Sequence, residues 1–117
     1  MSIAITLPYP PSANRMWRNV NGRVVKAKEG RDYMEQVRRE MMGRNVPRLT
    51  GDVAVTLNFY RPRKSGDLDN RLKQTLDSLT GIAWDDDKQV VEIHACRFED
   101  KANPRVELTI AAVKGGA

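Results

Sequence analysis

The chain has 117 residues, of which 40% are hydrophobic and 30% are charged, and this length and composition fit one domain with a single core and exclude wholesale disorder. Lys and Arg number 20 against 15 Asp and Glu, and the formal charge of +5 favours a polyanionic partner, nucleic acid before an acidic membrane surface. There is no run of about 18 apolar residues, no signal-peptide pattern at the N-terminus and only one cysteine, so we expect a cytoplasmic protein without a membrane span, a disulfide within the chain or a cysteine zinc cluster.

The periodicity of the apolar residues predicts four strands, two helices and a hairpin. Apolar and polar residues alternate in the strands, apolar residues recur at helical spacing in the helices, and the pair Asn21-Gly22 marks the turn of the hairpin. Pro8 ends the first strand, and Gly43 and Gly81 end the helices. In chain order, the predicted elements are a strand over 3–7, a hairpin over 20–26, a helix over 28–43, a strand over 53–60, a helix over 69–80, and strands over 91–96 and 105–110.

This order of elements predicts the fold class. Alternating strands place one face in the core, as in antiparallel or mixed sheets, and two helices are enough to cover one face of such a sheet. We therefore predict a two-layer α+β fold, with a mixed or antiparallel sheet of about four strands, two helices on one face and a small N-terminal hairpin. Residues 1–113 form the single predicted domain, and residues 114–117 form a flexible tail.

Two groups of aspartates flank the second predicted helix. Asp67 and Asp69 precede it, and Asp85, Asp86 and Asp87 follow it. Residues two apart point in nearly opposite directions in a helix but share a face in an extended chain, so Asp67 and Asp69 converge only if the helix starts near Asp69. A helix of about a dozen residues and a loop can return the chain alongside, but spacing alone does not show that the two groups meet.

If the two groups meet, their chemistry points to a hard divalent cation. Crowded carboxylates raise one another's pKa unless a cation neutralises them, and oxygen ligands without His or Cys suit Mg²⁺, with Mn²⁺ as a substitute, rather than Zn²⁺. In a phosphodiester hydrolase such an ion polarises the phosphate and lowers the pKa of the attacking water. Lys73 lies four residues after Asp69 on the same helical face, where its ammonium can stabilise charge on a phosphate oxygen.

A structural explanation of the same residues stays open. Aspartate at a helix N-terminus is favoured by capping and by the helix dipole, Asp69 with Lys73 is also an ordinary exposed ion pair, and three aspartates in a loop are commonly solvated. A calcium-binding EF-hand is excluded, because loops beginning at Asp67 or Asp85 lack the glycine and the glutamate at the required positions.

Basic residues lie beside the first acidic group and near the N-terminus. Lys and Arg attract a phosphate backbone while carboxylates hold the ion, so this combination suits a nuclease. Trp17, near two of the arginines, either stacks on an unpaired base or packs against the hairpin. The basic residues within 61–64 either bind DNA or belong to a solvated loop. The candidate DNA-binding residues are Arg15, Arg18, Arg61, Arg63, Lys64 and Arg71.

The chain resembles the RusA family of Holliday junction resolvases over nearly its whole length. The resemblance rests on three segments: residues 5–15 (ITLPYPPSANR), residues 67–70 (DLDN) with Lys73, and residues 84–91 (WDDDKQVV). The second and third segments are the more specific, and the order and spacing of all three agree with the family.

The resemblance implies a Mg²⁺-dependent homodimeric endonuclease of phage or prophage origin, which nicks opposed strands of a four-way DNA junction symmetrically in DNA recombination and repair. By position, Asp67, Asp69 and Asp87 are the implied catalytic and metal-binding carboxylates, with Asp86 as the alternative to Asp87, and Lys73 is the implied essential basic residue. We expect the protein in the cytoplasm of a bacterial or phage-infected cell, with no membrane partner and no small-molecule cofactor.

Two other functions stay open. One is a catalytically silent nucleic-acid-binding protein with the same fold, and the other is a small structural or regulatory protein whose acidic loop is solvated. The presence of every motif carboxylate and of Lys73 favours the nuclease over the silent nucleic-acid-binding protein. The basic excess and the motif spacing argue against the structural or regulatory protein.

Overall fold

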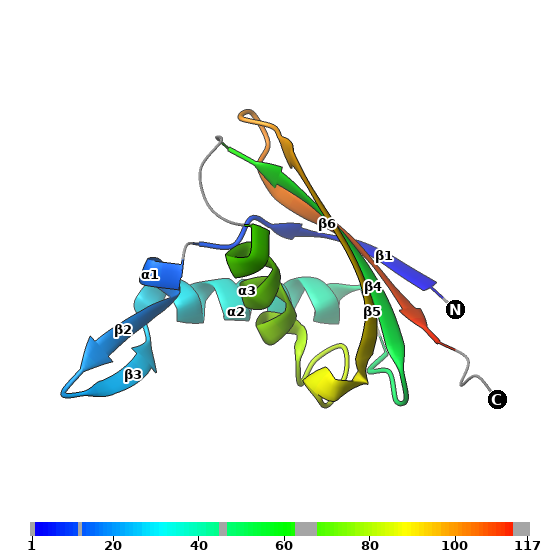
Figure 1. Cartoon of the computed structure of the whole chain (residues 1–117), viewed down its shortest axis with the longest axis horizontal. Helices are drawn as coiled ribbons and strands as arrows, with labels where there is room; N and C mark the ends of the chain where they lie inside the picture. The colour runs from blue at the N-terminus through cyan, green and yellow to red at the C-terminus, as the bar shows by residue number, and fades with distance from the viewer. Residues whose placement is uncertain (1, 12, 45–46, 63–67, 114–117) are drawn as a thin grey trace.

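The computed structural model describes residues 2–11, 13–44, 47–62 and 68–113, and only the backbone of residues 13, 14 and 68–70. Arg63, Lys64, Asp67 and the predicted tail 114–117 therefore lie outside the described residues. Figure 1 shows the elements, which in chain order are β1 (Ser2–Pro8), α1 (Ala13–Met16), β2 (Trp17–Val20), β3 (Arg23–Lys26), α2 (Lys28–Gly43), β4 (Val53–Arg61), α3 (Leu68–Leu79), the 3₁₀ turn η1 (Asp87–Gln89), β5 (Val90–Glu99) and β6 (Arg105–Ala112).

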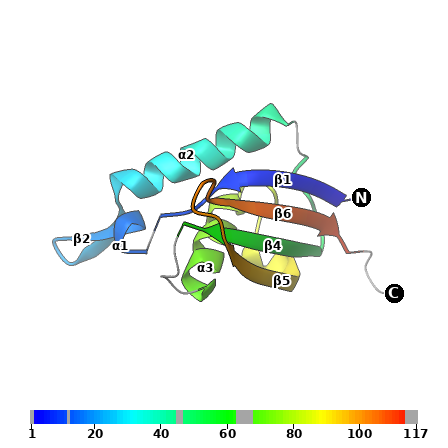
Figure 2. The ribbon, with the colours of Figure 1, turned by 90° about the horizontal axis from the view of Figure 1, so that it is seen from above.

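Four strands form one mixed sheet in the order β1-β6-β4-β5. β6 pairs antiparallel with both β1 and β4, whereas β4 pairs parallel with β5. α2 and α3 lie on one face of this sheet, and the hairpin β2–β3 projects from the domain (Figures 1 and 2). The predicted two-layer α+β arrangement is confirmed, including the two helices on one face and the hairpin.

The core lies between the sheet and the helices. Every second residue of β4 from Val53 to Phe59 is at most 1% exposed, because alternate strand residues point to the same face. α2 contributes the apolar stripe Tyr33, Val37 and Met41. The Tyr33 hydroxyl donates a hydrogen bond of 2.9 Å to the backbone oxygen of Pro8, and burial raises the pKa of this hydroxyl. These contacts fix α2 against the end of β1.

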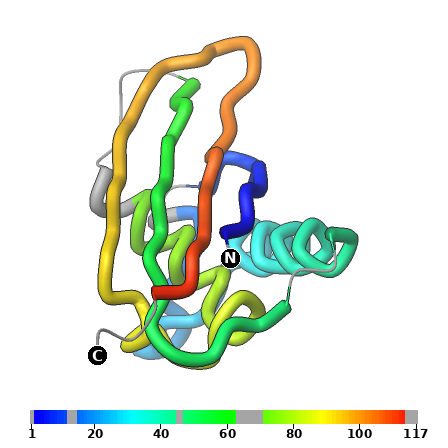
Figure 3. Tube along the Cα trace, turned by 90° about the vertical axis from the view of Figure 1, so that its right-hand side faces the viewer, coloured from blue at the N-terminus to red at the C-terminus, as the bar shows by residue number. Residues whose placement is uncertain are grey.

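β5 differs from the prediction that each strand has one face in the core. Val91 and Ile93 are 51% and 45% exposed, although Ile93 pairs with the buried Val55 of β4. β5 is an edge strand next to β4, as Figure 3 shows, and α3 does not pack fully against its inner side. Its inner side therefore borders a cavity beside α3 instead of solid core.

The parallel pair β4 and β5 decides where the acidic residues lie. The chain leaves β4 at Arg61, passes through α3 and enters β5 at Val90, whose partner is Val53 at the start of β4. Asp69 thus lies in the first turn of α3, and Asp87 lies in η1 after the helix. Asp87 lines one cavity with Leu72 and Lys73, which come about one helical turn after Asp69.

The N-terminal hairpin is longer than predicted. β2 and β3 pair from Trp17–Lys26 to Val20–Arg23, and the one-turn helix α1, which was not predicted, precedes them. Asn21 and Gly22 have φ of 51° and 77°, the left-handed conformation that a two-residue type I′ turn requires. In α2, a Cβ on Gly30 would clash with the backbone oxygen of Met16, so glycine permits the close approach of α1 and α2.

Candidate active site

The three consecutive aspartates after α3 have three different environments. The Asp85 carboxylate accepts a hydrogen bond from the Arg48 guanidinium, with 2.9 Å from Nη1 to Oδ1. The Asp86 carboxylate caps η1 and accepts a hydrogen bond of 2.9 Å from the backbone N–H of Lys88. This bond, together with a hydrogen bond to Asp87, lowers the pKa of Asp86. Asp87 instead lines a cavity between α3 and β5.

Gln89 holds this acidic loop in place. Its Oε1 accepts hydrogen bonds from the backbone N–H groups of Asp85 and Asp86, at 2.9 and 3.0 Å. Its Nε2 donates to the backbone oxygens of Leu49 and Gly51, at 3.0 and 2.8 Å. One side chain therefore ties the loop to a segment about 40 residues earlier in the chain, which fixes the position of Asp87.

The cavity between α3 and β5 has a volume of about 450 Å³. Its walls are mostly apolar, and Trp84 at its inner end is fully buried, with its Nε1 donating to the Thr80 hydroxyl at 3.1 Å. The charged residues that line it are exposed, so they face solvent on one side and the apolar wall on the other. The residues that line it are Leu72, Lys73, Leu76, Asp77, Trp84, Asp87, Val90 and Ile93.

Lys73, Asp77 and Asp87 are the charged groups of this cavity. Burial raises the pKa of the Asp77 carboxyl, while the Lys73 ammonium lowers it and the Asp87 carboxylate raises it. These opposing influences show that the three groups lie within electrostatic reach of one another. The structure thus brings together Lys73 and Asp87, which the sequence placed in two separate motifs.

Asp77 was not among the site residues predicted from the sequence. The available signal was its spacing, because Asp69, Lys73 and Asp77 follow one another at intervals of four residues and so share one face of α3. Lys73 therefore has an acidic residue one turn before it and another one turn after it. The position of Asp77 in the cavity with Lys73 and Asp87 makes it a candidate for positioning the ammonium.

The first acidic group is only partly visible. Asp69 lies in the first turn of α3 with its side chain outside the described residues, and Asp67 precedes them. Among the side chains that the structure describes, no group of three His, Cys, Asp or Glu residues is arranged to hold a metal ion. Whether Asp67, Asp69 and Asp87 share one cation remains a prediction.

The predicted DNA-binding arginines have unequal surroundings. Arg15 and Arg18 are exposed, and the Arg15 guanidinium lies 3.9 Å from the carboxylate of Glu29. The side chain of Arg61 is only 12% exposed and is paired with Glu99 at 3.3 Å. Arg61 is therefore poorly placed to reach a phosphate, because it is turned into the sheet edge instead of the solvent.

Arg71 connects α3 to the proline-rich segment after β1. Its Nε donates a hydrogen bond of 3.3 Å to the Tyr9 hydroxyl, and its guanidinium lies 5.4 Å from the centre of the Tyr9 ring. The Tyr9 ring in turn meets the ring of Phe59 edge-on at 6.5 Å. These contacts explain why the first motif and the acidic motif lie together, and they leave Arg71 half-buried.

Comparisons with known proteins point to one family. A family model described as "Endodeoxyribonuclease RusA" matches residues 8–111. A protein of Enterobacteria phage 82 named "Crossover junction endodeoxyribonuclease rusA" is 38% identical over 109 residues, which cover 91% of each chain. Proteins of the same name from Escherichia coli (strain K12) and Shigella sonnei (strain Ss046) are both 36% identical over 110 residues, or 92% of each chain. In the part of the chain that is described, no helix is long and apolar enough to cross a membrane.

Proposed function

Because the chain belongs to the RusA endodeoxyribonuclease family, we propose that it hydrolyses phosphodiester bonds in four-way DNA junctions. The activity is Mg²⁺-dependent in this proposal, and it nicks two opposed strands symmetrically during DNA recombination and repair. The observation that carries the proposal is the cavity that Lys73 and Asp87 line together, since these residues come from the two motifs that most specifically resemble the family.

The donor set fits a hard divalent cation. Asp67, Asp69 and Asp87 would hold Mg²⁺, or Mn²⁺ in its place, and these residues offer oxygen ligands only. Asp85 and Asp86 are less suitable, because an arginine and a backbone N–H already occupy their carboxylates. When bound, the ion supplies polarisation of the phosphate and a lower pKa for the attacking water.

The other residues of the cavity act on the phosphate itself. The Lys73 ammonium donates hydrogen bonds to a non-bridging phosphate oxygen and stabilises the negative charge that grows there during cleavage. Asp77, one turn further along α3, lines the same cavity and restrains the position of the ammonium. Leu72, Leu76 and Ile93 form the apolar wall beside these groups.

DNA binding in this proposal uses cations outside the cavity. Arg15 and Arg18 at the base of the hairpin, and Arg71 on α3, contact phosphates, as do Arg63 and Lys64 beside the acidic motif. A junction presents symmetry-related strands, so we propose that the active form is a homodimer with two equivalent sites. The formal charge of +5 per chain favours binding of such a dimer to DNA.

Incubation of purified protein with a labelled mobile four-way junction tests the proposal. We expect paired nicks in Mg²⁺ and none in EDTA, and we expect Asp69→Asn to lose cleavage while it keeps junction binding, because a carboxylate near the phosphates is removed. Binding without cleavage by the parent protein in either Mg²⁺ or Mn²⁺ would instead favour a silent DNA-binding protein. Equal turnover by Asp69→Asn and the parent would remove Asp69 from the site.

A further inference from the structure

A second hollow lies between α2, the C-terminal end of α3 and the turn after it. It consists of two adjoining cavities of about 550 and 440 Å³, which share Arg38, Met42, Gly81 and Ile82. The larger cavity reaches from Lys26 at the end of the hairpin to Thr80, and the smaller one continues to Arg48. We call this continuous hollow the α2–α3 groove.

Cations dominate the charged lining of the α2–α3 groove. Among the residues that the structure describes, the larger cavity is lined by four cations and two carboxylates, and the smaller cavity by two cations and no carboxylate. Arg48 is paired with Asp85, but no carboxylate of the described residues lies within 4.0 Å of the ammonium or guanidinium of Lys26, Arg38 or Arg39. The cations that line the groove are Lys26, Arg31, Arg38, Arg39 and Arg48.

Helical spacing explains why so many cations face one groove. Arg31, Glu35, Arg38, Arg39 and Met42 lie at intervals of three and four residues, so they form a stripe along α2 beside the apolar stripe that faces the core. Arg31 and Arg38 are separated by about 10 Å along the helix axis. That length equals the rise of about three nucleotides of one strand of duplex DNA.

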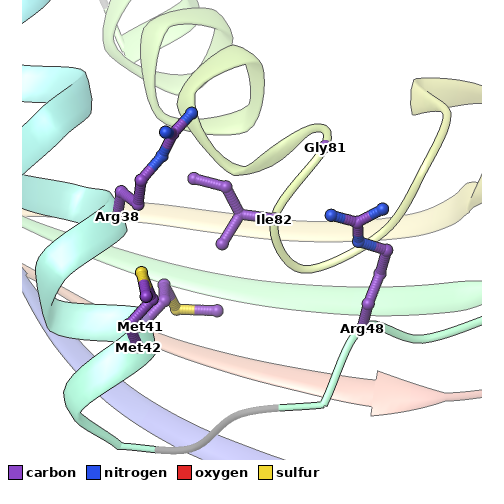
Figure 4. Close-up of a pocket in the computed structure, with 6 residues that line it drawn as sticks. All are labelled: Arg38, Met41, Met42, Arg48, Gly81 and Ile82. Atoms are coloured by element: carbon purple, nitrogen blue, oxygen red, sulfur yellow. The ribbon is translucent and has the colours of Figure 1, made fainter.

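The floor of the α2–α3 groove is apolar. Met41 is 2% exposed beneath it, and Ile82 and Met42 complete the surface. Figure 4 shows the side chains of Arg38 and Arg48 on either side of Ile82. Charged forks above an apolar floor suit a ligand that has both anionic groups and apolar faces, which describes a sugar-phosphate chain better than an isolated anion.

The groove also adjoins the candidate active site. Asp77 lines both the larger cavity of the groove and the cavity that holds Lys73 and Asp87. A DNA strand whose scissile phosphate lies beside Lys73 can therefore continue past the end of α3 into the groove. Each repeat of its backbone would meet another cation along α2.

We propose that the α2–α3 groove binds the phosphodiester backbone of the DNA strand that leaves the cleavage site, with Arg38 as the central contact. This inference rests on the proposed function, since it assigns the path of the same substrate. Arg38 is central because it lines both cavities, whereas Arg39 and Arg48 each line one. A planar guanidinium binds a phosphate through two parallel hydrogen bonds.

The salt dependence of junction binding tests the groove. Binding is measured in EDTA, which prevents Mg²⁺-dependent cleavage, for the parent, Arg38→Ala, Arg38→Lys and Arg44→Ala. Arg44 is a matched control because it is an exposed arginine that lines a different cavity, with residues of β1, β4 and β6. We expect Arg38→Ala to reduce the slope of log K against log[salt] by about 0.9 for each protomer, or about 1.8 for the dimer, so its disadvantage shrinks about 12-fold between 50 and 200 mM salt.

A matched modification of the DNA locates the contact. Single methylphosphonate linkages, which are neutral, are placed in turn along each arm of the junction. We expect at least one position, on the strand that leaves the cleavage site, to weaken binding of the parent and to leave binding of Arg38→Ala unchanged. Arg38→Lys retains most of the slope, and Arg44→Ala matches the parent in sensitivity to that position. Arg39→Ala gives a second variant of the groove if thermal melting shows that Arg38→Ala does not fold.

The results separate the groove from the activity. Parent-like salt slopes for Arg38→Ala and Arg39→Ala, or a loss in Arg44→Ala as large as in Arg38→Ala, overturn the groove even if the parent cleaves junctions. A parent that binds junctions with the expected slope difference but never cleaves them supports the groove and overturns the proposed activity. A parent-like slope together with a lower dimer content of Arg38→Ala in sedimentation overturns the DNA assignment, because it shows that the groove receives a protein segment.

Discussion

The two hollows beside α3 differ in the residues that line them. The cavity toward β5 has apolar walls with one lysine and two aspartates, whereas the α2–α3 groove is lined by five cations. Charges among apolar walls interact strongly and over short distances, which suits bond cleavage. Exposed cations give attraction that salt screens, which suits holding of a polyanion. Substitutions in the cavity should therefore change the cleavage rate, and substitutions in the groove should change affinity and its salt dependence.

The largest effect is expected for Asp87→Asn. Loss of the carboxylate that lines the cavity with Lys73 should lower the rate of junction cleavage by about 10³-fold, the upper range for one electrostatic group. Junction affinity should stay within about twofold, because no phosphate contact of the groove is removed. Single-turnover cleavage and a binding titration in EDTA measure the two quantities.

Asp85→Asn is the matched control. It removes an equal charge two residues before Asp87, from a carboxylate that pairs with Arg48. We expect it to cleave within about fivefold of the parent, as befits an exposed ion pair. The opposite ranking, with Asp85→Asn inactive and Asp87→Asn active, would mean that the cavity toward β5 is not the active site.

Lys73→Ala should have the next largest effect. Without the ammonium, the charge that develops on the phosphate is left unbalanced, and cleavage should fall by about 10²-fold. Lys73→Arg should recover part of the rate because it keeps the charge, although its planar group is shaped differently. If both variants lose affinity in proportion to rate, Lys73 belongs with the binding cations and not with the cleavage cavity.

The local elements were predictable because their signals are local. The stripe Tyr33, Val37 and Met41 with its terminal glycine predicted α2 with the observed ends, and the leucine spacing predicted α3 to within one residue at either end. The exposure of β5 was not predictable, since its alternation equals that of the buried β4. What differs is that a cavity lies between β5 and α3, which depends on how the helix packs on the sheet.

The residue types of the site were predictable from the sequence, but the role of each residue was not. Asp85, Asp86 and Asp87 are the same residue type. They differ because Asp85 pairs with Arg48, 37 residues away, Asp86 accepts a hydrogen bond from a backbone N–H, and Asp87 lines the cavity. The basic stripe of α2 gave no functional signal in the sequence, because the cavities beside it form only when α3 and the turn at Gly81 pack alongside. Such contacts between distant segments are what a local pattern cannot supply.

Gln89→Ala should weaken the cavity without removing any of its charges. The side chain makes four hydrogen bonds that join the acidic loop to Leu49 and Gly51, so its loss lets Asp87 move relative to Lys73. We expect cleavage to fall by about 10-fold, as for groups that orient a reactive ligand, and the free energy of unfolding to fall by about 1–2 kcal/mol. Denaturant melts and single-turnover rates check both. A stability loss with an unchanged rate would show that the loop does not control the site.

The smallest effect is expected for Asp77→Asn, which lies where the two hollows meet. Burial raises the pKa of Asp77 above its ordinary value, so the folded chain binds this proton more tightly than the unfolded chain does. The ionised carboxylate therefore lowers the free energy of unfolding at neutral pH, and this cost disappears as the pH falls below the ordinary carboxyl pKa of about 3.9.

Asp77→Asn should consequently melt at a slightly higher temperature than the parent at pH 7 in EDTA, and at the same temperature near pH 3. Its cleavage should fall by less than about fivefold, because an exposed partner of Lys73 contributes about 0.2–1 kcal/mol. Thermal melts across this pH range test the first expectation, with Asp85→Asn as the control. A melting difference that does not vary with pH would mean that Asp77 is not desolvated. A change in salt slope as large as that of Arg38→Ala would mean that Asp77 acts in the groove and not in the cavity.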